Sequence, residues 1–125
     1  MNTNYSHKDL SGMFLPGGSM ANFMFFGTNL SGANFAGADL RESILSEANL
    51  RGADLSGANL YSTDFRHADM RGVDLTDADL RNADLRGVDL RKAKVRGAKF
   101  AGADLRGAKL RGTTFDHDAL DNALI

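Results

Sequence analysis

The side chains that could do chemistry here are carboxylates, cations and three histidines. The pair Asp64 and Arg66 recurs at regular intervals further along the chain, as a structural ladder would. Two carboxylates act as general acid and base only where their environments separate the two pKa values, and a repeated, exposed row provides no such difference. His7, His67 and His117 lie in three separate regions without metal-ligand spacing. We therefore expect no catalytic, cofactor-binding or metal-ligating residue, and no enzyme activity.

These residues lie on a strict five-residue period. Every fifth residue from Leu10 to Ile125 is apolar, and we call these positions centres. The position two residues before a centre is usually small, and every glycine except Gly18 lies two residues after a centre. An α-helix would spread this period around its axis, and a flat strand would send it to alternate faces. A chain that turns a corner every five residues can bury one large and one small side chain per face.

The residues after each centre have the chemistry of a corner. A turn from one centre to the next small residue places glycine at the third position, where a type II turn requires a positive φ. Since a Cβ atom disfavours positive φ, we expect other turn geometries at the corners that hold Glu42, Glu47, Ser62, His67, Asp77 and Lys92. Asn22 and Asn82 are left open, because Asn tolerates this region.

Units such as Ala38-Asp39-Leu40 and Ala103-Asp104-Leu105 resemble the pentapeptide repeat family, and the resemblance covers nearly the whole chain. It implies an all-β fold, a right-handed quadrilateral β-helix with four pentapeptides per coil, which gives about five to six coils. We expect one domain over residues 1–125, with an irregular N-terminal coil or cap at 8–27, regular repeats at 28–115 and a C-terminal cap or short helix at 116–125.

The first coil departs from the repeat pattern with large apolar residues at outward positions. Stacking at four pentapeptides per coil places Met24 directly above Ile44, and the group also includes Phe14 and Phe26. One interpretation is a cap that closes the solenoid, which terminal repeats need. The other is an exposed apolar patch for self-association or for a partner.

The C-terminal end also departs from the pattern, because Asp118 falls in a small-residue position where burial is costly. We expect the regular coils to stop near Phe115, followed by a short helix capped by Asp118. The alternative is a frayed sixth coil that uses Leu120 and Ile125 as centres. By resemblance to family members that dimerise through a terminal coil, Leu120, Leu124 and Ile125 are candidates for a homodimer contact or a cap.

Charge divides the chain along its length. Residues 39–80 carry four Arg against nine Asp and Glu, a balance of −5, whereas residues 81–112 carry ten Lys and Arg against three Asp, a balance of +7. We expect the Asp64–Arg66 pair and its repeats to neutralise one another. The cations without an obvious partner form a candidate binding patch, namely Arg91, Lys92, Lys94, Arg96, Lys99, Lys109 and Arg111.

These features predict a rigid protein-interaction or scaffold module that binds a protein partner. One alternative follows from the resemblance: some members mimic DNA, protect DNA gyrase and confer quinolone resistance, but that activity goes with a strongly negative surface. The other alternative is binding of nucleic acid or another anionic partner through the basic coils. Tyr61 is the only outward aromatic residue in 29–114, which argues against base stacking.

The remaining composition bears on disulfide chemistry, membrane association and cellular location. The chain has no cysteine, so disulfide and thiolate chemistry are excluded. Its first ten residues are polar, and no apolar run approaches the length of a membrane span. We therefore expect a cytoplasmic protein without cofactors and without a membrane partner.

Overall fold

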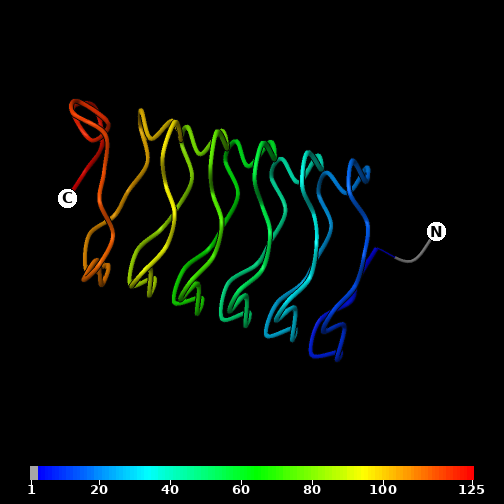
Figure 1. The fold of residues 1–125 in the computed structure, drawn as a ribbon. Helices are drawn as coiled ribbons and strands as arrows, with labels where there is room; N and C mark the ends of the chain where they lie inside the picture. Colours follow the sequence, from blue (N-terminus) through cyan, green and yellow to red (C-terminus); the bar gives the residue numbers. More distant parts are fainter. Residues whose placement is uncertain (1–2) are drawn as a thin grey trace.

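Each five-residue unit makes one short straight segment and one corner. In the computed structural model, which describes residues 3–125, the segment holds one residue in a parallel bridge, which we call the bridge position, and then the inward centre. The next two residues form a turn, and these described residues contain no α-helix and no strand longer than a single bridge. Four units bring the chain once around the axis, and the coils stack into a rod (Figure 1).

Backbone hydrogen bonds between successive coils set the stacking. Asn29 forms a parallel bridge with Asn49, four units further along the chain. The N–H of Leu30 donates to the carbonyl of Asn49 (2.7 Å), and the N–H of Asn49 donates to the carbonyl of Thr28 (2.9 Å). The same offset recurs on every face, from the Asn4–Met24 bridge onward. The coil length implied by the resemblance is therefore confirmed, and the architecture is a quadrilateral β-helix.

The corners share one conformation whether or not they contain glycine. Gly32 has a φ of 68°, and the N–H of Ala33 closes its turn on the carbonyl of Leu30 (3.0 Å). The expectation of other geometries at corners without glycine is wrong. Positive φ values of 55–61° occur at Glu42, Glu47, Ser62, His67, Asp77 and Lys92. Asn22 and Asn82, with φ values of 63° and 60°, do the same. The neighbouring coil imposes this conformation, as at Glu42, whose N–H is held by the carbonyl of Tyr61 (3.0 Å).

The two inward columns form one continuous core along the axis. Centres from Met20 to Leu105 are at most 3% exposed, and the small positions from Thr28 to Ala103 are at most 7% exposed. Buried hydroxyl groups at the small positions form hydrogen bonds with backbone carbonyls. Thr63 Oγ1, for example, donates to the carbonyl of Leu40 (2.8 Å). This packing explains why one large and one small residue alternate so strictly.

The N-terminal coil has the same backbone as the coils that follow it. Asn4 pairs with Met24, so regular pairing begins before residue 8. The difference lies in burial, because Leu15 is 42% exposed and Leu10 is half-buried, whereas the later centres are covered on both sides. The irregularity of this coil is therefore one of side chains at the open end of the rod.

The last coil loses its pairing and then regains it. The N–H of Gly97 binds the carboxylate of Asp116 (2.8 Å) instead of a backbone carbonyl, while Leu124 returns to a parallel bridge with Asp104. Between them, residues 117–122 form successive turns and no helix. The expected short helix at 116–125 is absent. The alternative of a frayed coil holds only in part, because Leu120 packs against the core whereas Ile125 is exposed. Asp118 adopts a φ of 66° and stays exposed, so its carboxylate remains in water instead of in a small-column position.

Candidate functional site

Most outward Asp and Asn residues serve the corner that follows them. The side chain of Asp104 accepts the backbone N–H of Arg106 at 3.1 Å, and Asn59 accepts that of Tyr61 at the same distance. This Asx geometry satisfies a corner N–H that would otherwise face water. Asp and Asn therefore precede the centres for a structural reason, and the sequence interpretation missed it although the two-residue spacing carries the signal.

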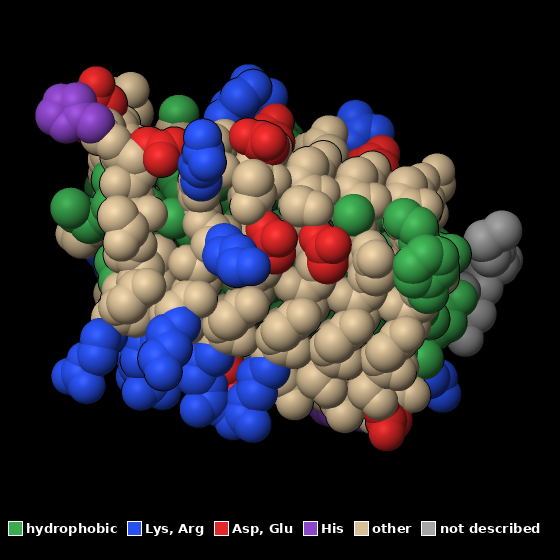
Figure 2. All heavy atoms as spheres, viewed as in Figure 1, with side chains coloured by type: hydrophobic (Ala, Val, Ile, Leu, Met, Phe, Trp, Pro, Cys, Tyr) green, Lys and Arg blue, Asp and Glu red, His purple; other side chains and the backbone are tan. Residues whose placement is uncertain are grey.

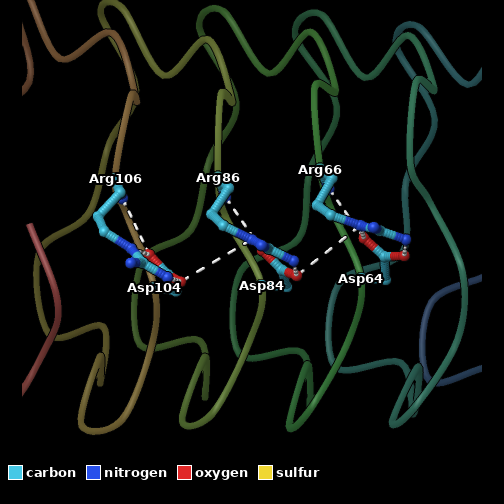
Figure 3. Close-up of polar contacts among 6 residues, drawn as sticks. All are labelled: Asp64, Arg66, Asp84, Arg86, Asp104 and Arg106. Carbon is cyan, nitrogen blue, oxygen red and sulfur yellow. Dashed lines mark hydrogen bonds and ion pairs between the residues drawn. The ribbon is translucent and has the colours of Figure 1, made fainter.

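Where Arg stands two residues after Asp, the pair forms a two-pronged clamp. Arg106 donates from Nε to Asp104 Oδ1 (2.9 Å) and from Nη2 to Oδ2 (2.6 Å). The pattern recurs as Asp39–Arg41, Asp64–Arg66, Asp69–Arg71, Asp79–Arg81, Asp84–Arg86 and Asp89–Arg91. Figure 3 shows one such ladder, in which Arg86 Nε also lies 3.8 Å from Asp104 Oδ2 in the next coil. The predicted neutralisation within and between coils is confirmed for this face.

The clamps lower the pKa of the carboxyl groups, which makes them poor general acids at neutral pH. The hydrogen bond from Arg106 lowers the pKa of Asp104 to about 2. Hydrogen bonds from Arg86 and Arg91 likewise lower the pKa of Asp84 and Asp89. A general acid at neutral pH needs the opposite shift. Within residues 3–125, no three acidic or imidazole side chains converge to hold a metal ion. No helix in this part of the chain has the length and hydropathy to cross a membrane.

The structure separates the predicted basic patch into one clamped residue and six that are not clamped. Arg91 Nη2 lies 2.7 Å from Asp89 Oδ2, so the expectation that Arg91 lacks a partner is wrong. Within the described range, no ion pair forms at Lys92, Lys94, Arg96, Lys99, Lys109 and Arg111. At Arg96 and Arg111 the cause lies two residues earlier, where Lys94 and Lys109 take the place of the Asp that forms the clamp elsewhere. Lys94, Lys99 and Lys109 stand over Asp74, Asp79 and Asp89 of the preceding coil and attract these carboxylates without a close ion pair.

Several cations meet along one corner of the rod. An open groove of about 510 Å³ is lined by Arg71, Gly72, Arg91, Lys92 and Arg111. Figure 2 shows Lys and Arg side chains gathered along the lower edge of the molecule toward its C-terminal end. We define the basic corner as Arg71, Arg91, Lys92, Lys109 and Arg111. Arg71 was not in the predicted patch, although its place one coil before Arg91 gives the signal.

The remaining predicted cations lie on other faces. Lys94 occupies the next face, Arg96 the corner after it and Lys99 the face beyond that corner. Near Lys99, Asp118 lines a second, smaller hollow, so an acidic residue of the tail lies close to that side. The predicted patch is therefore a belt around the rod, with its highest density of unclamped cations at the basic corner.

Only some of the apolar residues predicted to form a patch in the first coils lie next to one another. Met24 bridges to Ile44, as the stacking predicted, and is 38% exposed, whereas Ile44 is half-buried. Phe26 packs edge-on against His7 with ring centroids 5.3 Å apart. Phe14 is 73% exposed on another face. At the end of the rod, Leu10 and Leu15 help to line a small apolar hollow. A cap and a contact surface both remain predictions for this end.

At the other end, the candidates for a cap or a dimer contact differ in burial. Leu120 is half-buried against the core, while Leu124 and Ile125 are 55% and 77% exposed. Ile125 therefore does not act as an inward centre. Its role in self-association stays a prediction.

A quadrilateral β-helix whose interior is filled by two inward columns is a solenoid, a class of proteins built from stacked repeats. The family model described as pentapeptide repeats matches the segments 9–42, 24–60, 58–97, 78–116 and 90–123. This chain belongs to the pentapeptide repeat family, whose members form right-handed quadrilateral β-helices.

Several solved structures are similar to this chain. A pentapeptide repeat protein of the Arabidopsis thaliana thylakoid lumen is 36% identical, with a TM-score of 0.62 over 78% of this chain and 64% of that protein. This chain therefore spans less than two thirds of that relative. Rfr23 from the cyanobacterium Cyanothece 51142 is 26% identical, with a TM-score of 0.49 over 99% of this chain and 92% of Rfr23.

A further similar structure is that of QnrB1, a plasmid-mediated fluoroquinolone resistance protein. It is 21% identical, with a TM-score of 0.50 over 98% of this chain and 76% of QnrB1, a likeness that shows the fold alone. A search of curated proteins finds no match.

The similarity to the Arabidopsis protein corrects one expectation. That relative is located in the thylakoid lumen, which contradicts the expected cytoplasmic location. The polar start and the lack of a long apolar run, on which the expectation was based, report on membrane spans and not on compartments.

Proposed function

We propose that this protein is a non-enzymatic, rigid interaction module that binds a protein partner through its outward side chains. The inward columns support this role, because they are consumed by packing along the axis. The coil repeat fixes the backbone positions of the outward residues, so the rod presents them at a set spacing to a partner.

The observation that carries the proposal is the break in the Asp–Arg clamp pattern near the C-terminal end. Through residues 39–91, an Arg two residues after an Asp is held by that Asp, as in Asp79–Arg81. At Lys94 and Lys109 the acidic partner is replaced by a cation, and the following Arg96 and Arg111 are left without a carboxylate among the described residues. The fold does not need these cations, which makes them candidates for contact with a partner.

The test is affinity capture from native cells followed by cross-linking and mass spectrometry. The matched control is a surface variant that keeps both inward columns and replaces Lys92, Lys94, Arg96, Lys99, Lys109 and Arg111 with Ser or Gln. We expect the wild-type chain to retain a defined protein with cross-links to residues 91–111, and the variant to lose it while its circular dichroism is unchanged. Equal capture by both chains would contradict the proposal.

Protection of DNA gyrase has less support in this surface. A DNA mimic presents a continuous negative surface, whereas residues 81–112 carry a balance of +7. We expect purified protein at micromolar concentration to leave gyrase supercoiling and quinolone-induced cleavage unchanged. A change in either assay would favour mimicry of DNA over the module proposed here.

A further inference from the structure

Lys92 is the exception in a corner row that is otherwise glycine. The same corner of the other coils is occupied by Gly12, Gly32, Gly52, Gly72 and Gly112. Lys92 nevertheless adopts a φ of 61° in this row. A side chain in the left-handed region costs stability, and strain of this kind gathers at functional positions.

The side chain of Lys92 runs along the rod toward the next coil. A Cβ atom added to Gly112 would come within 3.1 Å of Lys92 Cγ, so the lysine stem lies over that glycine. Lys92 lines the open groove together with Arg91 and Arg111.

Lys109 changes the same corner in a second way. It stands in the bridge position that Asp89 holds one coil earlier, where the carboxylate clamps Arg91. With Lys at this position, the guanidinium of Arg111 has no carboxylate within ion-pair distance in the described chain. A free guanidinium offers paired donors that match one carboxylate in a two-pronged geometry.

The charges of the basic corner do not cancel. Its five cations face two carboxylates, Asp69 and Asp89, and both are already engaged by the Arg residues two positions later. Arg51 adds a further contact to Asp69 (2.6 Å). Lys92 and Arg111 therefore present two unclamped positive charges to the groove. Lys109, two residues before Arg111 and over Asp89, adds a third unclamped charge beside them.

The surroundings of the groove favour a short anion over a long one. Toward the N-terminus, residues 39–80 carry a balance of −5, which would repel a polyanion extending along the rod. The lining residues include no aromatic ring on which a base could stack. Tyr61, an outward aromatic residue on a different corner, is engaged by Asn82 (3.0 Å) and by Arg81, which lies 5.8 Å from the ring centroid.

We propose that the basic corner binds a short acidic segment of a protein partner, with Arg111 holding one carboxylate and Lys92 and Lys109 holding its neighbours. This inference rests on the proposed role as an interaction module and names the chemistry of the partner. Lys92 takes the place of a corner glycine, and Lys109 takes the place of the Asp that would clamp Arg111, so both leave charge available for such a segment.

The test uses fluorescence anisotropy with a labelled hexaglutamate peptide and the full chain. Lys109→Asp restores an Asp at the bridge position and should clamp Arg111, so we expect peptide affinity to fall at least tenfold. Lys99→Asp is the matched control, because it makes the same exchange in the same kind of position on another face. We expect a less than twofold change for Lys99→Asp, and weaker binding by the wild-type chain as salt concentration rises.

A second variant separates binding from folding. Lys92→Gly completes the glycine row, so we expect its thermal unfolding midpoint to rise by a few degrees while peptide affinity falls. A rise in both quantities would overturn the role of Lys92, and equal losses for Lys109→Asp and Lys99→Asp would overturn the basic corner as the site. Tighter binding of a single-stranded oligonucleotide of equal charge would overturn the choice of an acidic protein segment.

Capture from native cells distinguishes this inference from the broader proposal. If Lys109→Asp still captures the cellular partner, the interaction module stands and the basic corner is not its contact. If neither Lys109→Asp nor the wild-type chain captures a partner, the module itself fails.

Discussion

Leu75 shows what a single inward centre contributes to this fold. Its side chain is fully buried between the coils before and after it. Truncation to Ala leaves a cavity that stacked coils cannot close, so we expect Leu75→Ala to lower the free energy of unfolding by about 2–5 kcal/mol. Urea denaturation followed by circular dichroism measures this loss. The exposed, unclamped Arg96 provides a control, because Arg96→Ser should change stability by no more than about 0.5 kcal/mol. Equal effects at both positions would refute the inward assignment.

For single residues, the sequence predicted which side chains are buried, but it predicted the contacts of the outward side chains only in part. The apolar centre and its small companion follow from the five-residue period, since no other arrangement buries both. The clamp on Arg91 was missed because charge was counted by face, whereas the clamp depends on the two-residue spacing from Asp89. That spacing is visible in the sequence, but it acquires meaning only when the corner directs both side chains outward together.

The fold depends on its corners, where one residue adopts a positive φ. The backbone strain of a non-glycine residue at a corner can be measured at a position where the new side chain contacts nothing. A Cβ atom added to Gly52 would meet no neighbour, although Gly52 has a φ of 65°. Gly52→Ala should therefore cost about 1–2 kcal/mol from backbone strain alone. The reverse change, Glu42→Gly, should stabilise the chain, because Glu42 now bears that strain. Thermal unfolding of the two variants checks the pair of signs. Shifts in the same direction would show that corner strain does not decide stability.

The corners without glycine mark the limit of local reasoning. Intrinsic preference disfavours positive φ at His67 or Asp77, yet both adopt it. The N–H of His67 is bound by the carbonyl of Arg86 in the next coil (3.0 Å), and this contact is not visible in a five-residue window. The C-terminal segment shows the same limit, because helical spacing of apolar residues did not produce a helix where Leu124 could rejoin the ladder.

The clamp ladder predicts how stability responds to acid. Arg106 lowers the pKa of Asp104 to about 2 from its usual 3.8, so the ionised form is favoured in the folded state. This contribution is present above the usual pKa and is lost as the pH falls from about 4 toward 2. The pKa values of Asp39, Asp79 and Asp84 are lowered in the same direction. We therefore expect the unfolding midpoint to fall across this range.

The variant Arg106→Gln isolates one clamp of the ladder. Without the guanidinium, the pKa of Asp104 should rise toward 3.8, and the acid-induced loss of stability should become smaller. Side-chain carboxyl shifts measured by NMR titration report this pKa directly. Arg96→Gln removes the charge of an arginine that takes part in no clamp and serves as the control. An unchanged pKa in Arg106→Gln would mean that the clamp does not form in solution.

At the scale of the whole molecule, two periods with different origins are superimposed. The period of one pentapeptide follows from the sequence by itself and determines what is buried. The longer period, of one four-sided coil, came from the family resemblance, because any number of corners per coil would satisfy the shorter pattern. Only the ladder of bridges, such as Asn29 to Asn49, reveals which outward residues become neighbours. The candidate surface was thus less predictable than the core, since it depends on the longer period.

The separation of the two periods predicts that one whole coil can be removed. Deleting residues 49–68 joins Ala48 to Asp69, which preserves the small-to-bridge step found at Ala68–Asp69 and keeps every later residue on its face. Each coil contacts only its neighbours, so we expect a shorter rod with lower stability, a single cooperative transition and an unchanged circular dichroism shape. Deleting residues 49–58 instead keeps the five-residue period but turns all later coils by two faces.

Both deletions should bury their centres and keep the contacts of Arg71 with Asp89 and of Arg86 with Asp104, because these pairs lie after the deleted segments. Only the first keeps residues 29–48 facing the same outward positions in the coil that follows them. The basic corner lies wholly after the deleted segment, so hexaglutamate affinity should match that of the full chain in both. Loss of cooperative unfolding after removal of residues 49–68 would show that the coils are not interchangeable. The rod would then depend on a property of its middle coils beyond the packing of nearest neighbours.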